Sequence, residues 1–224
     1  MVYFFTTVNG LMVYMGKDKH ENEQLIKYGW PEDIWFHVDD LSSAHVYLRL
    51  PRGPLRKTFR QTGTLEHLPK EDLNDLLQLT KGNSISGSKK HDVSICYTEW
   101  ENLRKDAQKM DTGTIGFFDY KKVQHVLNVA REREVLKRIE KTKEERFPNL
   151  AEERRKRDVK VTQMKKKRVK AQKQAAAKEK AARKAEADRR DYKHILKEED
   201  MVANTSFAAS EDTSAAVAFE DDFM

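Results

Sequence analysis

The sequence predicts an α+β fold: a compact mixed α/β domain with a β-sheet and short helices, followed by a long charged helix and a disordered acidic tail. Short β-rich runs separated by Gly, Pro and Asn fill residues 1–130, which indicates a sheet with tight connections. Residues 131–200 consist mainly of Ala, Glu, Lys and Arg, which favour a helix, with an interruption at Phe147-Pro148. Residues 201–224 are acidic and of low complexity, as is typical of disordered segments. We therefore expect three parts with these boundaries.

A hairpin and a short helix are expected at the start of the domain. Residues 2–8 and 11–16 are β-rich, and the Asn9-Gly10 pair between them tolerates the positive φ angles of a two-residue type I′ turn. Next, HENEQLIKYG at residues 20–29 predicts a helix that ends at its glycine.

Residues 33–50, DIWFHVDDLSSAHVYLRL, predict two strands joined by a turn at Ser42-Ser43. Side chains alternate between the two faces of a strand, so each strand has an apolar and a mixed face. The apolar face carries Ile34, Phe36, Val38, Val46, Leu48 and Leu50; the other carries Trp35, His37, Asp39, His45, Tyr47 and Arg49. We expect the first face to be core and the second to display aromatic rings, imidazoles and charge.

The rest of the domain is expected to be a loop, a helix and two more strands. Residues 51–68 form a basic segment punctuated by Gly and Pro, which predicts a long loop. Residues 69–81 predict a helix, with Pro in its first turn and Gly82 after its end. DVSICYT at residues 92–98 and KVQHVLNV at residues 122–129 predict strands. A domain that ends near residue 130 is large enough to fold alone.

Charge is distributed unevenly along the chain. The formal net charge is +6, but residues 154–184 contain 15 basic and 2 acidic residues, and no basic residue follows Lys197. Sustained apolar heptad positions are missing from residues 150–190, so a solvated helix is favoured over a strong coiled coil. Such a helix suits a nucleic-acid backbone or an anionic membrane surface, and it equally suits a soluble spacer. The basic residues expected to act as a tether are Arg154, Arg155, Lys156, Arg157, Lys165, Lys166, Lys167 and Arg168.

Several classes of protein are disfavoured. The single cysteine, Cys96, excludes an internal disulfide, and no signal peptide or long apolar run is found. We expect a cytoplasmic protein, with nuclear or peripheral membrane locations left open. The glycine- and serine-rich residues 82–88 follow a helix rather than open one, so a phosphate-binding loop is not expected. No nucleophile–base pair or carboxylate dyad is evident, so we expect neither an enzyme nor a cofactor.

The mixed face of the strands suits nucleic acid. Rings of Trp, His and Tyr can stack on bases while a guanidinium binds phosphate. Further phosphate partners are expected at Lys17, Arg104, Lys105, Lys121 and Lys122. The alternative interpretation is that the imidazoles satisfy backbone groups at a sheet edge.

A metal site is a second alternative for the two histidines. His37, Asp39 and His45 form a His-x-Asp and His set like the facial triad of non-haem iron sites. Trp35 and Arg49 crowd the same face, and no further ligand cluster surrounds it in the sequence. We therefore expect no metal.

Two stretches together resemble a known family. YMGKDKHENEQLIKYGWPEDIWFHVDDLSSAHVYLRL, residues 14–50, and TGTIGFF, residues 112–118, are similar to the NFACT-R domain, the RNA-binding module of proteins that act with the ribosome and tRNA in the rescue of stalled translation. The resemblance extends over most of residues 1–150, and the overall layout is similar to stand-alone members. It implies a signature surface of Gly16, Lys17, Asp33, Trp35, His37, Ser43 and His45, with Gly113 and Gly116 in a later turn.

One segment departs from the family pattern. PRGPLRKTFRQTG, residues 51–63, replaces a much shorter link, and we interpret it as a tolerated surface insertion. Its basic residues Arg52, Arg56, Lys57 and Arg60 are alternative phosphate contacts.

The sequence and the resemblance together predict a non-enzymatic, translation-linked protein that binds RNA, either tRNA or ribosomal RNA. The alternatives are a DNA receptor or adaptor that uses the same surface and the basic helix, a helical scaffold for protein partners, a protein at an anionic membrane surface, and a metal-dependent enzyme. Residues expected to bind nucleic acid are Lys17, Trp35, His37, Ser43, His45, Tyr47, Arg49, Arg104, Lys105, Lys121 and Lys122. Replacement of both His37 and His45 by Ala is expected to weaken binding and leave the fold intact.

Overall fold

The computed structural model describes residues 1–106 and 108–190. The chain divides into two compact units, the first comprising Met1–Lys160 and the second beginning at Val161. The acidic segment expected at residues 201–224 lies outside the described residues, as do the last ten residues of the expected helix.

An antiparallel sheet of seven strands organises the first unit, in the order β8-β5-β3-β4-β2-β1-β9. The strands are β1 (Val2–Thr6), β2 (Met12–Gly16), β3 (Ile34–Val38), β4 (Val46–Arg49), β5 (Asp92–Glu99), β8 (Gln124–Ala130) and β9 (Glu144–Arg146). A separate ribbon pairs β6 (Leu103–Arg104) with β7 (Gly116–Phe117). The predicted α+β class is confirmed.

The predicted hairpin is present, but its turn is not the predicted two-residue type I′ turn, because Gly10 has a positive φ and Asn9 does not, and the Thr7 N–H donates to the Leu11 carbonyl at 3.0 Å across three loop residues. In β1 and β2, Thr6 pairs with Met12, and Gly10 has a φ of 81° that an L side chain rarely adopts. Buried carboxylates hold the turn, because Asp75 accepts the Val8 N–H at 3.1 Å and Asp72 accepts the Asn9 N–H at 3.1 Å. The hairpin is thereby attached to the helix that carries both aspartates.

One face of the sheet forms the main core, as predicted. The apolar residues of β3 and β4 on this face are fully buried. Three helices cover it: α2 (Pro54–Thr62), α3 (Lys70–Gly82) and α4 (Arg133–Glu140), which contribute Phe59, Leu76, Leu79, Leu136 and Ile139.

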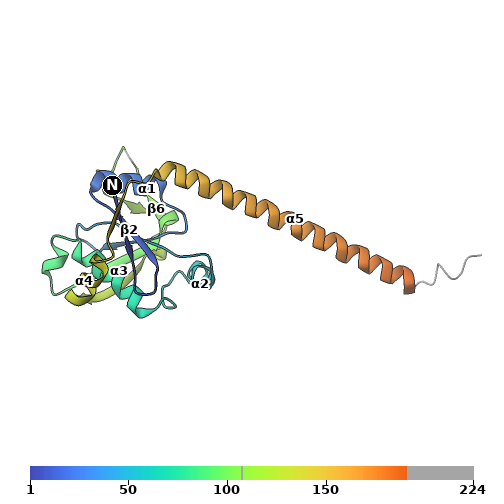
Figure 1. The fold of residues 1–224 in the computed structure, drawn as a ribbon, viewed down its shortest axis with the longest axis horizontal. Helices are drawn as coiled ribbons and strands as arrows, with labels where there is room; N and C mark the ends of the chain where they lie inside the picture. Colours follow the sequence, from blue (N-terminus) through green and yellow to red (C-terminus); the bar gives the residue numbers. More distant parts are fainter. Residues whose placement is uncertain (107, 191–224) are drawn as a thin grey trace, which may run out of the picture. The chain divides into compact units, whose positions relative to one another are not determined.

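The opposite face of the sheet is a second core, which corrects the expectation of an open recognition surface. Trp35, His45 and Tyr47 are 2%, 3% and 0% exposed. Leu25 of α1 (Lys19–Tyr28) and Leu103 of β6 pack in the same cluster. Figure 1 shows α1 on the side of the sheet away from α3 and α4. Aromatic side chains have large apolar surfaces, so this face is stabilised by burial.

Half of the segment predicted as a loop at residues 51–68 is helix α2. Pro54 occupies its first turn, and Gly63 follows its end with a φ of 72° and an N–H that donates to the Phe59 carbonyl at 2.7 Å. Proline at the first position and left-handed glycine after the last are the ordinary start and stop signals of a helix. The Gly and Pro residues interpreted as loop punctuation therefore mark the ends of the helix.

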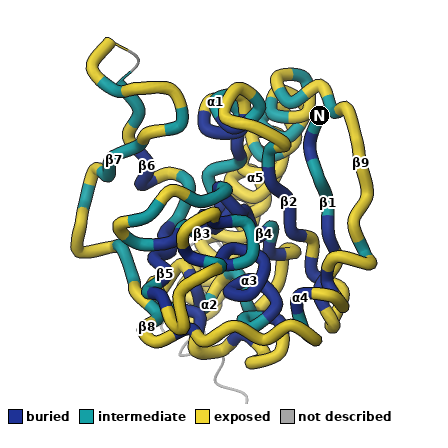
Figure 2. Tube along the Cα trace, turned by 90° about the vertical axis from the view of Figure 1, so that its left-hand side faces the viewer, coloured by how far each residue is buried: buried dark blue, intermediate teal, exposed yellow. Residues whose placement is uncertain are grey.

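The first unit extends past the boundary expected near residue 130. Leu136 and Ile139 of α4 fill the main core, and β9 pairs with β1. The long helix α5 (Leu150–Arg190) begins only after Pro148, where the Asn149 side chain accepts the Glu152 N–H at 3.1 Å. The expected helix from residue 131 is therefore two helices separated by a strand. Figure 2 shows the central strands buried and β9 exposed.

Three short 3-10 helices complete the described elements, η1 (Gly87–Lys89), η2 (Trp100–Asn102) and η3 (Tyr120–Lys122). Within residues 1–106 and 108–190, no helix has the length and apolar character needed to cross a membrane.

Candidate nucleic-acid groove

A groove of about 930 Å³ lies where the end of β2, strand β3 and the β3–β4 loop meet the segment before β7. We call it the His37 groove. Its lining includes Gly16, Lys17, Lys19, Trp35, His37, Ser43, His45, Gly113 and Phe117. It thus brings together residues from three separate parts of the sequence.

Aromatic and imidazole rings form one wall of the groove. Trp35 and His37 stack with centroids 5.4 Å apart and planes 7° from parallel. His45 meets both rings edge-on, with its centroid 5.4 Å from that of Trp35 and 5.0 Å from that of His37. His37 is half-buried, so it is the imidazole with access to solvent.

Two buried polar atoms of this wall have no hydrogen-bond partner, the Trp35 Nε1 and the His45 Nδ1. An unsatisfied buried donor or acceptor costs about 1–3 kcal/mol, and each one in a folded protein calls for an explanation. The Tyr47 hydroxyl on the same face of the sheet is a further buried atom of this kind.

Both imidazoles are held neutral. Burial lowers the pKa of His45 to about 3, with the neighbouring His37 acting in the same direction and the backbone of Gly113 opposing it. Burial also lowers the pKa of His37. Neutral imidazoles offer one N–H and one lone pair, which suits base and sugar groups rather than phosphate. The cations of the lining are the exposed Lys17 and Lys19, and the same lining carries three carboxylates, Asp18, Asp39 and Asp40.

The buried neutral His45 should make stability depend on pH. Its folded pKa of about 3 lies below the usual value of 6.5, so the unfolded chain binds more protons between these values. The stabilisation is therefore complete above pH 6.5 and is lost as the pH falls, by about 2 kcal/mol between pH 7 and pH 5. Urea unfolding at several pH values should show a flatter dependence for His45→Gln than for the wild type. His91→Gln, at a side chain that is 93% exposed, is the control. Equal slopes for wild type and His45→Gln would contradict the prediction.

Lys105, predicted to bind phosphate, instead holds the backbone beside the groove. Its Nζ donates to the Glu23 carboxylate at 2.8 Å and to the carbonyls of Asp111 and Thr114 at 2.7 and 2.9 Å. Glu23 also accepts the Gly113 N–H at 2.6 Å. These bonds fix the segment that covers His45, so Lys105 positions the groove and its ammonium is already engaged.

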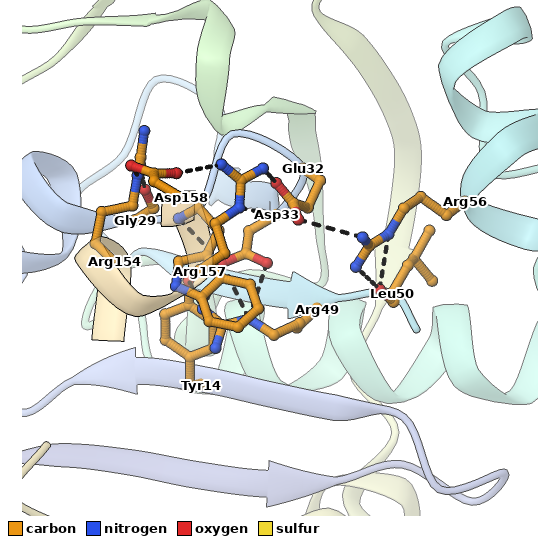
Figure 3. Close-up of polar contacts among 11 residues, drawn as sticks. Tyr14, Gly29, Glu32, Asp33, Arg49, Leu50, Arg56, Arg154, Arg157 and Asp158 are labelled. Atoms are coloured by element: carbon orange, nitrogen blue, oxygen red, sulfur yellow. Dashed lines mark hydrogen bonds and ion pairs between the residues drawn. The ribbon is translucent and has the colours of Figure 1, made fainter. Parts of the chain in front are cut away.

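Arg49 and Tyr47 lie away from the groove. The Arg49 Nη2 donates to the fully buried Asp33 carboxylate at 2.7 Å, and its guanidinium lies 3.6 Å from the centre of the Trp30 ring. Tyr14 donates a short hydrogen bond to the same carboxylate and stacks on Tyr47. Figure 3 shows Tyr14, Asp33 and Arg49 converging. The prediction that Arg49 presents a guanidinium to phosphate is corrected, because Asp33 already occupies it.

Glu32 joins two helices to the sheet, an arrangement that sequence reasoning missed. Its carboxylate is 5% exposed and receives Arg56 of α2 and Arg157 of α5 (Figure 3). Burial alone would raise the pKa of Glu32, but Arg157 and then Arg56 lower it below its usual value. Arg154 donates to the Gly29 carbonyl. No local pattern reveals these contacts, because Arg157 lies 125 residues from Glu32.

The expected tether residues therefore have different roles. Arg154 and Arg157 are bound within the first unit, whereas Arg155 and Lys156 are exposed, the latter 2.9 Å from Glu152. The remaining four, Lys165, Lys166, Lys167 and Arg168, are exposed on the part of α5 in the second unit. Only the exposed residues have cations directed to solvent.

The other predicted site residues are spread over the first unit. Ser43 is half-buried, and its hydroxyl accepts the Val38 N–H at 3.0 Å. It therefore closes the β3–β4 turn at the groove. Arg104, Lys121 and Lys122 are exposed at the β6–β7 ribbon and η3.

Comparison with known proteins now identifies the family. Residues 1–119 match the family described as "NFACT protein RNA binding domain". This chain belongs to that family. Coiled-coil domain-containing protein 25 of Danio rerio is 53% identical over 161 residues, 70% of this chain and 73% of the relative. Its namesake from Mus musculus is 49% identical over 208 residues, 91% of this chain and 95% of the relative.

One solved structure also aligns with the chain. It is titled "The structure of the C-terminal of the fibronectin/fibrinogen-binding protein from Streptococcus suis (FBPS)", with a TM-score of 0.47 and 17% identity over 61% of this chain and 48% of that chain.

Membership of the NFACT RNA-binding family supports an RNA- or nucleic-acid-binding role in general. The signature implied by the resemblance largely coincides with the His37 groove, since it shares Gly16, Lys17, Trp35, His37, Ser43, His45 and Gly113 with the groove lining. Asp33 and Gly116 lie elsewhere.

Gly16 is needed for close packing, because a Cβ there would be 2.9 Å from the Asn22 backbone nitrogen in α1.

The metal alternative gains no geometric support in this NFACT-family chain. Asp39 pairs with the His125 Nδ1 at 3.3 Å. Among the described residues, no three His, Cys, Asp or Glu side chains are placed to hold a metal ion together. Cys96 is buried at the groove, where burial raises the pKa of its thiol to about 12, so it packs as a thiol.

Proposed function

We propose that this protein is a non-enzymatic, cytoplasmic RNA-binding protein linked to translation, and that it binds tRNA or ribosomal RNA at the His37 groove. The observation that carries the proposal is the composition of the groove: neutral imidazole and aromatic rings with unpartnered polar atoms in its wall, and exposed lysines on its lining.

Each part of the groove suits one part of a nucleotide. Bases and riboses are recognised by rings and neutral donors or acceptors, whereas phosphates are bound by cations. A volume of about 930 Å³ is within the range of sites that take small organic ligands, so a nucleotide can enter. The half-buried His37 is the ring best placed to meet it, and Lys17 and Lys19 supply charge.

Removal of the groove lysines should weaken RNA binding in a salt-dependent way. For Lys17→Gln with Lys19→Gln, the slope of log affinity against log salt should fall by about 1.4, and affinity by about tenfold near 0.15 M salt. His37→Ala should also weaken binding. Fluorescence anisotropy with labelled tRNA at several salt concentrations measures both. Lys89→Gln with Lys90→Gln removes the same charge from exposed positions that do not line the groove. An equal loss in both double variants would contradict the proposed site.

His37→Ala is a better test of the groove than the variant in which both His37 and His45 are replaced by Ala. His45 is 3% exposed and packs against two rings, so its removal leaves a cavity and lowers stability. The expectation that the double variant leaves the fold intact is corrected for this reason.

DNA of the same sequence separates the RNA proposal from the DNA receptor or adaptor. Only RNA carries the 2′-hydroxyl that a protein can use to distinguish the two. Tighter binding of RNA supports the proposal, and tighter binding of DNA favours the alternative. A protein scaffold would bind its partner in a salt-insensitive way and leave RNA unbound.

A further inference from the structure

Two large aromatic side chains project into solvent just after β7. Phe118 is 72% exposed and Tyr120 is 73% exposed, and the next two residues, Lys121 and Lys122, are exposed lysines. We call these four residues the Tyr120 ridge. Exposed apolar rings grouped with cations are unusual on a surface without a binding role. Neither ring lines the His37 groove.

The backbone under the ridge is rigidly held. Asn102, which is 6% exposed, accepts the N–H groups of Phe118 and Asp119 at 3.0 and 2.9 Å and donates to the Asp119 carbonyl at 2.9 Å. Thr98 donates to the Lys122 carbonyl at 3.1 Å. The rings are thus presented to solvent by a fixed backbone, so little conformational entropy is lost when a ligand binds them.

A continuous row of rings connects the ridge to the His37 groove. His37 stacks on Trp35, and Phe117 lies 5.6 Å from Trp35. Tyr120 meets Phe117 edge-on at 5.6 Å. Phe117 also lines the groove. Trp35 is 2% exposed, so Phe117, which lines the groove and contacts Tyr120, is the ring through which the groove adjoins the ridge.

The ridge also carries cations that are free to bind phosphate. In the described part of the chain, Lys121, Lys122 and Arg104 take part in no ion pair. Carboxylates are present as well. The Asp119 carboxylate accepts the Lys121 N–H at 2.9 Å. Glu99 is half-buried, and burial raises the pKa of its carboxyl while Arg60 and Lys122 act in the opposite direction.

We infer that the RNA bound by this protein is a single-stranded segment, which passes from the His37 groove over Tyr120 and Phe118 with its phosphates at Lys121 and Lys122. This inference rests on the proposed RNA function and specifies the class of RNA. Bases in a duplex are stacked and paired, so their faces are closed to side chains, whereas unpaired bases stack on exposed rings. Rings beside cations favour such a strand over an apolar protein surface, which would gain nothing from the lysines.

The test compares an unstructured single-stranded RNA with a duplex RNA of the same length by fluorescence anisotropy, using the full chain. Phe118→Ala with Tyr120→Ala should weaken binding of the single strand about fivefold or more for each stacked base and leave duplex binding unchanged. Phe118→Tyr with Tyr120→Phe keeps both rings and should retain affinity. Phe147→Ala removes a ring that is 81% exposed elsewhere and should have no effect. Phe118→Ala alone provides a second variant. Tyr120 contacts the ring of Phe117, so its removal can disturb the core, whereas no such ring contact is found for Phe118 among the described residues.

The outcomes separate the inference from the function on which it rests. If the ridge variants bind the single strand as tightly as wild type while His37→Ala is weakened, the inference fails and the proposed function stands. If neither the ridge nor the groove variants change RNA binding, both fail. Equal losses for duplex and single strand, or retention of RNA binding with loss of a protein partner, also overturn the inference. Thermal melts of each variant verify that the chain is folded.

Discussion

Asp33→Asn is expected to lower the free energy of unfolding of the first unit by about 3–5 kcal/mol, because it removes one charge of a buried ion pair and leaves the other. Asp33 is 0% exposed and accepts Arg49 Nε at 3.0 Å and Nη2 at 2.7 Å. Asn has nearly the same shape, so the change removes charge without making a cavity. The Arg49 guanidinium would then lie under Trp30 without its counter-ion.

Thermal unfolding measures this effect directly. For a unit of about 150–250 residues, 1 kcal/mol corresponds to about 2–4 °C, so the melting temperature should fall by about 6–20 °C. Glu179→Gln is the matched control, since it breaks an exposed pair with Arg183 on α5 and should change stability by less than about 1 kcal/mol. If the melting temperature of Asp33→Asn falls no further than that of Glu179→Gln, the pair of Asp33 and Arg49 contributes little to stability.

Neutralising four cations of α5 is expected to cause the largest loss of RNA affinity. Lys165, Lys166, Lys167 and Arg168 are exposed, and their replacement by Gln keeps strong helix formers in place. Each phosphate contact contributes about 0.7 to the slope of log affinity against log salt, so the loss of four contacts should lower the slope by roughly 3. At 0.15 M salt this corresponds to a loss of RNA affinity of about a hundredfold. Preference among RNAs should survive, because base contacts remain in the first unit.

The control keeps the charge and changes the residues: Lys165→Arg, Lys166→Arg and Lys167→Arg with Arg168→Lys should retain both slope and affinity. An unchanged slope in the Gln variant would identify α5 as a soluble spacer. If the Gln variant keeps RNA binding and loses association with vesicles of anionic lipid, the helix is a membrane-surface element.

Six of the seven strands of the sheet could be predicted because their signals are local, whereas β9 lies in a segment that the sequence predicted to be helical. Asn9-Gly10 specifies a tight turn, and the alternation in residues 33–50 places Ile34, Phe36 and Val38 on the core face. The same alternation does not show whether the second face is covered. Trp35 and Tyr47 suit a buried layer as well as an exposed one, so burial of the face depends on α1 and β6, whose positions are not encoded locally.

Only part of the candidate site could be predicted, because the sequence shows local patterns and not contacts between distant residues. His37, His45 and Lys17 come together in one groove, as the resemblance implies. The partners that engage Arg49 and Lys105 could not be predicted, because a charged side chain in a sequence shows no sign of its counter-ion. Arg49 lies 16 residues from Asp33, and Lys105 lies 82 residues from Glu23.

The pairing of β1 with β9 has a consequence for synthesis of the chain. The first strand made lies beside the last strand of the sheet, so its outer edge stays open until residues 144–146 have left the ribosome. Arg157, which neutralises Glu32 after β9, is made later still. Contacts between such distant segments slow folding, because the chain between them must first be ordered. The domain therefore completes its fold only when nearly all of its first unit has been translated, and until then the newly made chain presents an unpaired edge to its surroundings.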